Sequence, residues 1–359
     1  MKRIIINIIF CLCYLGGVLL FAWPDIKHLV SEQENQAVIQ EFDQVVKGRK
    51  VQAESSAGDG EKEITMADTE PDMEALASAS DELLQAMKKY NIELYESEQT
   101  SLQDPWSYET ESLDLTQYGI NNNLIGILKV PKMDLELPIY LGANETNMAK
   151  GAALLGQTSF PLTGNNTNVV LAAHRGWKGI PMFREIQKLE LGDRLTIQNY
   201  WETLTYQVTD IMVVMPDEID KIFIQPDKNM VTLITCHPYT KNSRRYVVCC
   251  ELVGVNLPEE TITGQESGEA STQEQLNESS TNGQADDTNT ENAFTASGDT
   301  QQESAEQIRE SAIEEDKETM AKEKRERIIG YVVIAILGVV SAVAMFGTGK
   351  KKQPKAKTN

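Results

Sequence analysis

Cysteine and histidine are scarce in this chain of 359 residues, which has five of the first and three of the second. Two cysteines lie in an apolar N-terminal run, Cys249 and Cys250 are adjacent, and Cys236 stands alone. Neighbouring residues of a strand point to opposite faces, so Cys249 and Cys250 cannot easily pair with each other. The spacing fits neither a disulfide framework nor a zinc site, so we expect no metal and no cofactor. Cys236 is therefore free for chemistry of its own.

Positive charge is also in short supply, because 33 Lys and Arg against 54 Asp and Glu leave a net charge of -21. A surface that binds phosphates needs the opposite sign, so we expect no nucleic acid among the partners. The acid is unevenly placed, since residues 259–299 contain ten acidic residues and no Lys or Arg. Much of the net charge therefore belongs to a polar tail and not to a folded core.

Two apolar runs without charge, residues 4–23 and 328–346, are long enough to cross a bilayer. The first follows a basic start at residues 1–3 and precedes no cleavage pattern, which favours an uncleaved anchor over a cleaved leader. The second precedes a basic tail at residues 347–359. The positive-inside rule then places both termini in the cytoplasm and the catalytic part outside, although residues 322–327 also carry basic side chains. We therefore expect a two-span protein of the cell membrane.

The region after the first run, residues 24–100, predicts two amphipathic helices around an acidic loop. Apolar residues recur at helical spacing over residues 31–49 and again over residues 72–96. The loop between them is almost free of large apolar side chains. We expect these two helices to form an N-terminal hairpin.

The rest of the outer part divides into three segments. Residues 101–114 form a turn-rich segment, and residues 115–256 form a core that is large enough to bury its own interior. Residues 257–327 form an acidic linker. Its first part, to about residue 305, is too poor in apolar residues to repay its ordering entropy and should be disordered. Residues 301–327 are rich in helix formers and predict a charged helix.

Short strands at close spacing dominate the core and favour a mostly β fold, a barrel or sandwich, over a parallel sheet. The expected strands are at residues 125–130, 135–141, 168–173, 194–198, 204–215, 231–236 and 245–255.

The strand at residues 231–236 ends in Cys236, and a proline stops it two residues later. Even-numbered residues from Thr232 to Cys236 share one face, and odd-numbered residues from Val231 to Thr235 share the other. Cys236 should thus lie at the rim of a sheet with a turn beyond it. A reactive side chain can be held rigidly there and still meet a substrate.

A cysteine needs a nearby imidazole or cation to be a useful nucleophile at neutral pH. His28 lies close to the first apolar run, and His237 is adjacent to Cys236 and points to the opposite face. His174 remains, at the end of another predicted strand. A lone histidine is more often structural than catalytic, but elimination and the strand-end position favour catalysis by His174.

An acyl-transfer enzyme also needs donors for the developing oxyanion. Arg244 and Arg245 follow the cysteine strand across a tight turn. Antiparallel pairing would bring one of them beside Cys236. The residue types alone do not choose between the two arginines.

Together these residues resemble the sortases, a family of cysteine transpeptidases of Gram-positive bacteria. Thr232-Leu-Ile-Thr-Cys236 resembles their Thr-Leu-x-Thr-Cys signature, and His174 in Leu-Ala-Ala-His-Arg-Gly resembles their histidine. The resemblance covers about residues 115–255 and implies the sortase β-barrel. It also implies that Cys236 is the nucleophile, that His174 is the general acid and base, and that Arg245 holds the substrate and its oxyanion.

Further motifs resemble the class C sortases, which assemble pili. Asp104-Pro105-Trp106 resembles their lid, in which the aspartate pairs with the catalytic arginine and the aromatic ring covers the cysteine. A second apolar run near the C-terminus is also typical of that class. The other matching motifs are Leu115-Thr-Gln-Tyr-Gly119, Val130-Pro-Lys132 and Leu137-Pro-Ile-Tyr140.

The resemblance implies a reaction and its partners. Cys236 would attack the Thr–Gly bond of an LPXTG-like sorting signal to give an acyl-enzyme, and a lysine of another pilin would resolve it. The implied partners are pilin subunits, with that signal and an acceptor lysine, and the bilayer. We also expect Leu233, Thr235 and His237, beside Cys236 on its strand, to contribute to substrate binding. His237 departs from the family, which usually has a small polar residue there.

Three alternatives stay open. A sortase can anchor surface proteins to a cell-wall precursor instead of joining pilins. A papain-like cysteine protease would orient its histidine with Asn or Asp and use water as the acceptor. A membrane-tethered structural or adhesion protein would carry the strand cysteine only incidentally.

Overall fold

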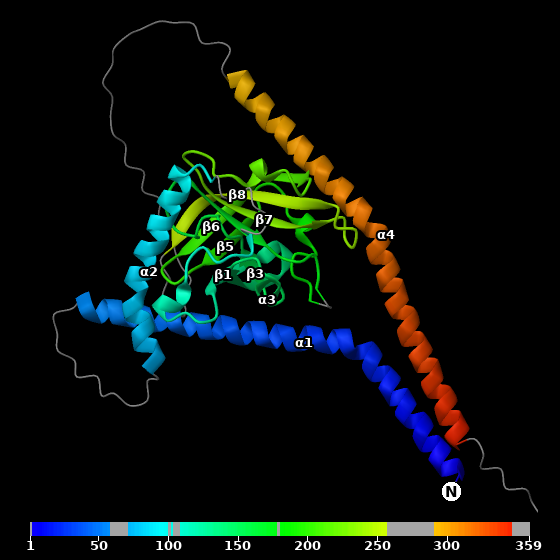
Figure 1. The fold of residues 1–359 in the computed structure, drawn as a ribbon. Coiled ribbons are helices and arrows are strands. Elements are labelled where there is room, and N and C mark those ends of the chain that lie inside the picture. Colours follow the sequence, from blue (N-terminus) through cyan, green and yellow to red (C-terminus); the bar gives the residue numbers. More distant parts are fainter. Residues whose placement is uncertain are drawn as a thin grey trace, which may run out of the picture.

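A closed barrel of eight strands lies at the centre of the computed structural model, which describes residues 2–57, 71–99, 102, 108–177, 180–256 and 291–346 (Figure 1). Around the barrel the strand order is β1-β2-β3-β4-β7-β8-β6-β5. The strands are β1 (Leu124–Val130), β2 (Leu135–Leu141), β3 (Ala152–Leu154), β4 (Thr167–Ala172), β5 (Arg194–Gln198), β6 (Thr203–Val214), β7 (Asn229–His237) and β8 (Arg244–Asn256). The prediction of a mostly β barrel is confirmed.

Strand β3 is the one that the sequence analysis missed. It has only three residues, two of them alanines, so it is too short to show alternation. It pairs in parallel with β2 and antiparallel with β4, and it closes that side of the barrel. The other strands lie within two residues of their predicted ends.

Strands β4 and β7 are parallel neighbours, and their side chains alternate between the barrel interior and its outer face. Leu171 and Leu233 are opposite each other and belong to the main core. Ala172 and Ile234 are the next pair, and they pack with a second apolar cluster outside the barrel. The alternation predicted for residues 231–236 is confirmed.

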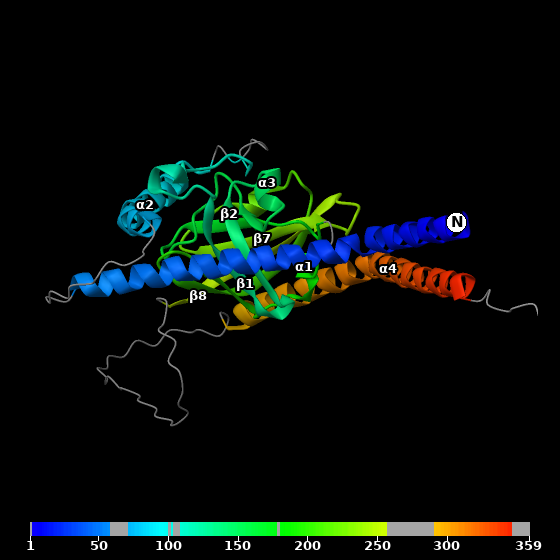
Figure 2. The same ribbon diagram turned by 90° about the horizontal axis from the view of Figure 1, so that it is seen from below.

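Helix α1 (Lys2–Ala57) and helix α2 (Pro71–Glu96) contain the two expected N-terminal helices. Asn91 ties α2 to the barrel, because its side chain forms hydrogen bonds of 3.0 and 2.8 Å with the backbone of Phe160. The two helices cross in Figures 1 and 2 and do not lie antiparallel, so the predicted hairpin was wrong. Each helix buries apolar side chains in the core that it shares with the barrel; these are Ile39, Phe42, Val46, Leu83 and Met87.

Helix α4 (Glu291–Phe346) follows the outside of the barrel and contacts β6 and η5 (Ile186–Lys188) (Figure 1). The charged helix expected at residues 301–327 is part of α4. The disorder predicted up to residue 305 was wrong for residues 291–305, which are helical, and residues 257–290 lie outside the described residues. The remaining short helices are η3 (Leu115–Tyr118), η4 (Pro131–Met133), α3 (Glu145–Met148) and η6 (Ile219–Ile222).

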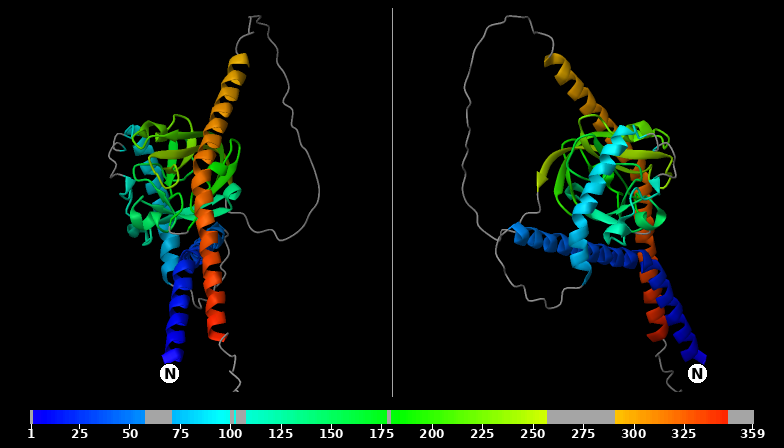
Figure 3. Two further views of the ribbon diagram at one scale, coloured as in Figure 1. Left: turned by 90° about the vertical axis from the view of Figure 1, so that its right-hand side faces the viewer. Right: turned by 60° about the vertical axis from the view of Figure 1, so that its left-hand side comes forward.

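The start of α1 and the end of α4 lie side by side and run in opposite directions (Figure 3). The Tyr14 hydroxyl donates to the Ile334 carbonyl at 3.1 Å, and the rings of Phe21 and Tyr331 meet edge-on at 4.9 Å. A side chain on Gly330 would collide with Phe21, so glycine permits the close approach of the helices. Within the described ranges, no helix combines the length and apolar character that a bilayer crossing needs.

Candidate active site

The ends of β4 and β7 bring His174 and Cys236 to the same edge of the barrel. In the parallel register Ala172 is opposite Ile234, and Cys236 and His174 each follow two residues later. Two hydrogen bonds continue this register, from the Ala173 amide to the Ile234 carbonyl at 3.3 Å and from the Thr235 hydroxyl to the Ala173 carbonyl at 2.7 Å. The predicted nucleophile and base are therefore neighbours, although they are 62 residues apart in the sequence.

Arg245 is the arginine that shares a face with Cys236. Strands β7 and β8 are antiparallel, with Cys236 opposite Arg245 and His237 opposite Arg244. Directly opposite residues of an antiparallel pair point to the same side of the sheet. The Arg245 guanidinium donates to the carbonyls of Asn242 and Arg244 at 3.2 and 3.1 Å, whereas Arg244 binds Glu315 of α4. Of the two arginines that residue types alone left open, Arg245 is thus the one on the face of Cys236, as the predicted role requires.

His174 lies flat against Trp177, with ring centroids 4.3 Å apart and planes 10° from parallel. Burial lowers the pKa of His174 below its ordinary value of 6.5, and Glu145 opposes this only in part. The imidazole therefore favours its neutral form, which can accept a proton. Its Nε2 is buried and has no hydrogen-bond partner within the described part of the chain.

Trp177 is a site residue that the sequence analysis missed. The chain turns between the two rings at Gly176, whose φ of +88° lies in the left-handed region that favours glycine. An aromatic residue three positions after the histidine, with a glycine between them, was the available signal. A stacked indole restricts how the imidazole can rotate.

An apolar surface lies beside Cys236 on the outer face of β4 and β7. Val170 and Leu155 form its buried centre, and Tyr108, Ala172, Ile234 and Phe223 pack around them. The Tyr108 carbonyl accepts hydrogen bonds from the amides of Ala143 and Gly156, at 2.8 and 3.0 Å, which fix this residue to the barrel. Tyr108 is the second residue that the sequence analysis missed.

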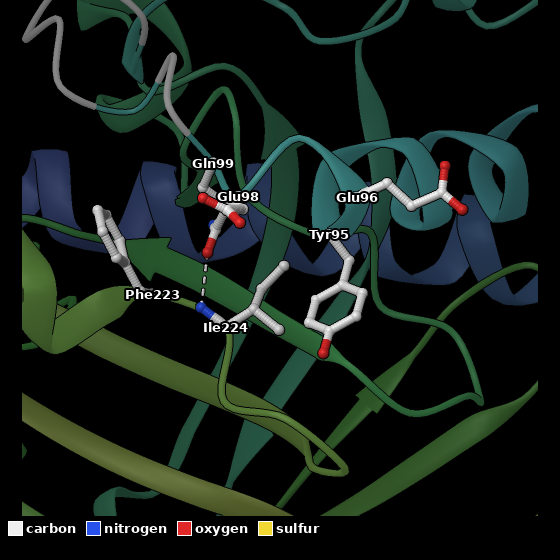
Figure 4. Close-up of a pocket in the computed structure, with 6 residues that line it drawn as sticks. All are labelled: Tyr95, Glu96, Glu98, Gln99, Phe223 and Ile224. Atoms are coloured by element: carbon white, nitrogen blue, oxygen red, sulfur yellow. Dashed lines mark hydrogen bonds between the residues drawn. The ribbon is translucent and has the colours of Figure 1, made fainter.

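The predicted lid residues Asp104, Pro105 and Trp106 lie outside the described residues. Tyr108 is the first residue after them that the structure describes. A pocket of about 450 Å³ is lined by residues that follow α2 or η6 and by the end of α2 itself; these are Tyr95, Glu96, Glu98, Gln99, Phe223 and Ile224 (Figure 4). Gln99 accepts a hydrogen bond of 2.6 Å from the Ile224 amide there. Phe223 belongs to both the pocket and the apolar surface.

Leu233, Thr235 and His237, expected as substrate contacts, lie on the face of β7 opposite to Cys236. They are 0%, 3% and 1% exposed. The same alternation that turns Cys236 outward turns these three side chains inward, so the structure does not support them as direct substrate contacts. Within the described part of the chain, no cluster of His, Cys, Asp or Glu could hold a metal ion.

Comparison with known proteins matches this barrel and its residues to one family. Residues 128–253 match the family described as "Sortase domain". Sortase A of Bacillus anthracis is 31% identical over 176 residues, which cover 48% of this chain and 80% of that protein. The fold and these matches define a cysteine transpeptidase. The chain belongs to the sortase family.

Two solved structures are also similar in sequence. A Clostridium perfringens sortase C, determined with the C-terminal cell wall sorting motif, is 35% identical, covers 48% of this chain and 89% of that one, and has a TM-score of 0.42. Sortase C1 of GBS pilus island 1 is 29% identical, covers 50% of this chain and 94% of that one, and has a TM-score of 0.45.

Proposed function

We propose that this sortase forms a thioester between Cys236 and an LPXTG-like sorting signal and transfers the acyl group to a lysine amine of a pilin. The observation that carries the proposal is the meeting of three residues at one edge of the barrel. Cys236 is directly opposite Arg245 on β8, and His174 lies two residues beyond the end of the neighbouring strand β4. A nucleophile, a base and a cation are the groups that acyl transfer through a thiol needs.

In the first half of the reaction, neutral His174 takes the proton of the Cys236 thiol, and the resulting thiolate attacks the carbonyl carbon of the signal's threonine. The carbonyl oxygen becomes negative in the tetrahedral intermediate, and the Arg245 guanidinium stabilises that charge. When the Thr–Gly bond breaks, protonated His174 gives its proton to the leaving glycine amine. The products are a thioester on Cys236 and a free C-terminal fragment.

In the second half, the lysine amine of the acceptor attacks the thioester. Neutral His174 takes a proton from the attacking nitrogen, in keeping with its lowered pKa. Collapse of the second intermediate breaks the C–S bond and returns the sulfur of Cys236 as thiolate. The new bond is an isopeptide bond between the signal's threonine and the acceptor lysine.

The apolar surface around Val170 and Ile234 is where we place the leucine and proline of the signal. It lies on the face of β7 that carries Cys236, and alternate side chains of an extended peptide can pack on such a surface. In the sequence, the predicted lid, Asp104 to Trp106, ends two residues before Tyr108, which packs on this surface. We therefore propose that the lid shields Cys236 until a signal binds, as an indole above a thiol would exclude water and oxidant.

The class C assignment rests on the sequence motifs, and the acceptor tests it. Purified enzyme is offered one sorting-signal peptide together with either a pilin-type lysine peptide or a lipid-linked cell-wall peptide. A pilin-joining enzyme forms product mainly with the first, and a cell-wall anchoring enzyme mainly with the second. Hydrolysis alone, with Arg245→Ala fully active, would favour a papain-like protease instead.

We also propose that residues 4–23 and 328–346 anchor the enzyme in the cell membrane with both termini in the cytoplasm. The antiparallel contact of α1 and α4 supports this, because the start of α1 lies beside the end of α4. The test is protease digestion of intact cells and of inverted vesicles that contain the full chain. The barrel should be cut only in intact cells whose wall is removed, and the basic tail only in inverted vesicles; the reverse pattern contradicts the topology.

A further inference from the structure

One face of α4 is buried against the barrel although the helix is highly charged. Ala305 and Ala312 are buried and Ile308 packs beside them, at spacings that put all three on one side of the helix. Asp316 follows Ala312 by four residues, continues the same face and is buried too. A buried carboxylate needs partners, because burial of an unpaired charge is costly.

The partners of Asp316 come from two separate segments beside the active site. One carboxylate oxygen accepts a hydrogen bond of 2.5 Å from Arg175, which directly follows His174. The other oxygen accepts one of 2.9 Å from the amide of Tyr239, in the turn between β7 and β8. The side chains of Arg175 and Asp316 are only 2% and 1% exposed. One carboxylate therefore joins the loop of His174 to the turn that follows Cys236.

Arg175 also joins the loop of His174 directly to the strand of Cys236. Its guanidinium donates to the backbone carbonyl of Cys236 at 3.4 Å and to the side chain of Gln187 at 3.0 Å, and it lies over the ring of Tyr246. The residue after the base thus bonds the backbone of the nucleophile. Asp316 supplies the negative charge that lets this guanidinium stay buried there.

His237 belongs to the same network. Its contacts there give a reason for a histidine at a position where the resemblance leads us to expect a small polar residue. Arg175 can only donate, so the 2.6 Å contact requires Nδ1 of His237 to accept. The proton is then on Nε2, which lies 3.0 Å from a carboxylate oxygen of Glu315. Burial and the nearby Arg175 lower the pKa of His237, in agreement with a neutral ring. Glu315 also binds Arg244, so α4 holds both strands that carry the site.

We propose that Asp316 is a positioning residue of the active site, which holds His174 beside Cys236 through Arg175 and the turn at Tyr239. The proposal rests on the catalytic roles given above to Cys236 and His174. Docking of α4 on the barrel is then required for full activity. The segment from Ala305 to Glu323 positions the active site as well as linking the barrel to the end of α4. A third contact, between Glu323 and Arg184, extends the docked segment by two helical turns.

The test compares two substitutions on the same helix in the full-length protein. Asp316→Asn removes the buried charge, and Glu314→Gln removes an exposed one that pairs with Lys317 at 3.0 Å. A shift of about 1 Å between reacting groups costs on the order of 100-fold in rate. Asp316→Asn should therefore lower kcat by about 10- to 100-fold, with KM for a sorting-signal peptide nearly unchanged, whereas Glu314→Gln should leave both constants as in the wild type.

Two more variants separate positioning from folding. Asp316→Glu keeps the charge and should restore part of the lost kcat. If Asp316→Asn fails to fold, the double variant Arg175→Gln with Asp316→Asn leaves no unpaired buried charge and should fold. It should still show the loss of kcat. A folded Asp316→Asn or double variant with the wild-type kcat overturns the proposal.

A readout without substrate keeps this proposal distinct from the proposed function. The rate at which iodoacetamide alkylates Cys236 is followed across pH by peptide mass spectrometry. Asp316→Asn should slow alkylation at pH 7 by about tenfold, because His174 is then no longer held where it can take the proton of the attacking thiol. Identical profiles overturn the positioning role. A wild type that never reacts with sorting-signal peptides, but whose profile still differs from that of the variant, overturns the proposed substrate alone.

Discussion

On one face of β7, Ile234 and Cys236 are partly exposed, whereas on the other face Leu233, Thr235 and His237 are buried. The two faces differ in chemistry as well as exposure. The outer face carries the thiol and an apolar surface. The inner face carries a hydroxyl and an imidazole, and each is hydrogen-bonded to a neighbouring segment. The proposed reaction therefore uses the outer face, whereas the inner face is tied to neighbouring segments.

The largest expected effect comes from the outer face. Cys236→Ala removes the nucleophile and should lower transpeptidation by on the order of 10⁴-fold without changing the thermal unfolding midpoint. Cys249→Ala is the matched control. Burial raises the pKa of the Cys249 thiol to about 11, so it is inert, and its removal should leave kcat unchanged. Equal loss of activity in both variants would contradict the assignment of the nucleophile.

Arg245 lies opposite Cys236 and Arg244 lies opposite His237, so substituting each arginine in turn compares the two faces. Arg245→Lys should lower kcat by about 10²- to 10³-fold, because a lysine cannot present the same planar donors to an oxyanion. Arg244→Lys should change kcat much less, since this side chain is directed to Glu315. Steady-state kinetics with one sorting-signal peptide gives both values. If the two effects were reversed, the register-based choice of Arg245 would not hold.

On the inner face, Thr235→Val tests structure more than chemistry. The substitution removes the hydroxyl that donates to the Ala173 carbonyl and leaves that buried oxygen without this donor. We expect the free energy of unfolding to fall by about 1–3 kcal/mol in urea titrations. KM should change little, because Thr235 is buried away from the apolar surface. A large rise in KM with unchanged stability would restore Thr235 as a substrate contact.

The smallest expected effect is a pH dependence of stability. The pKa of His237 is lowered from 6.5 by burial and by Arg175, so below pH 6.5 the unfolded chain binds this proton more readily than the folded one. The stabilising contribution is complete above that pH and is lost as the pH falls. The charged and titratable groups that face His237 are Arg175, Glu315, Asp316, Arg244 and Tyr246.

Urea unfolding at pH 7.5 and at pH 5.5 measures this contribution. Wild-type stability should fall between the two values, and the fall should be smaller in His237→Gln, which has no titrating ring. Hydrogen bonds from Arg244 lower the pKa of Glu315 below 4.5, so this carboxylate does not titrate in the window. His28→Gln, on α1, is the control and should keep the wild-type difference. An equal fall in wild type and His237→Gln would show that His237 is not responsible.

The sequence was sufficient to predict the barrel and the residues that lie beside Cys236. Threonine and branched residues alternate clearly in β7, and a strand-end histidine and a following arginine pair are features of local sequence. The family resemblance implied Arg245, and the register puts Arg245 rather than Arg244 opposite Cys236, which no composition argument could have shown. Short β3 was missed because three residues cannot show a period.

The role of α4 could not be read from its sequence for a physical reason. Its buried stripe is made of alanines and a charged Asp316, and these are also typical of a solvated helix. Only the position of Arg175 in the folded barrel makes that carboxylate a buried partner. The crossing of α1 and α2 was missed for a similar reason, because apolar periodicity identifies a buried face but not the surface that covers it.

The central claim, that Cys236 carries the acyl group, is tested most directly by intact-protein mass spectrometry. In one sample, wild-type enzyme is mixed with an LPXTG peptide and quenched in acid. In a second sample, a lysine-bearing acceptor is added before the quench. The predicted result is a mass increase equal to the peptide up to its threonine, located on Cys236 and lost when the acceptor is added. An unmodified Cys236 under conditions where the peptide is cleaved would contradict the account.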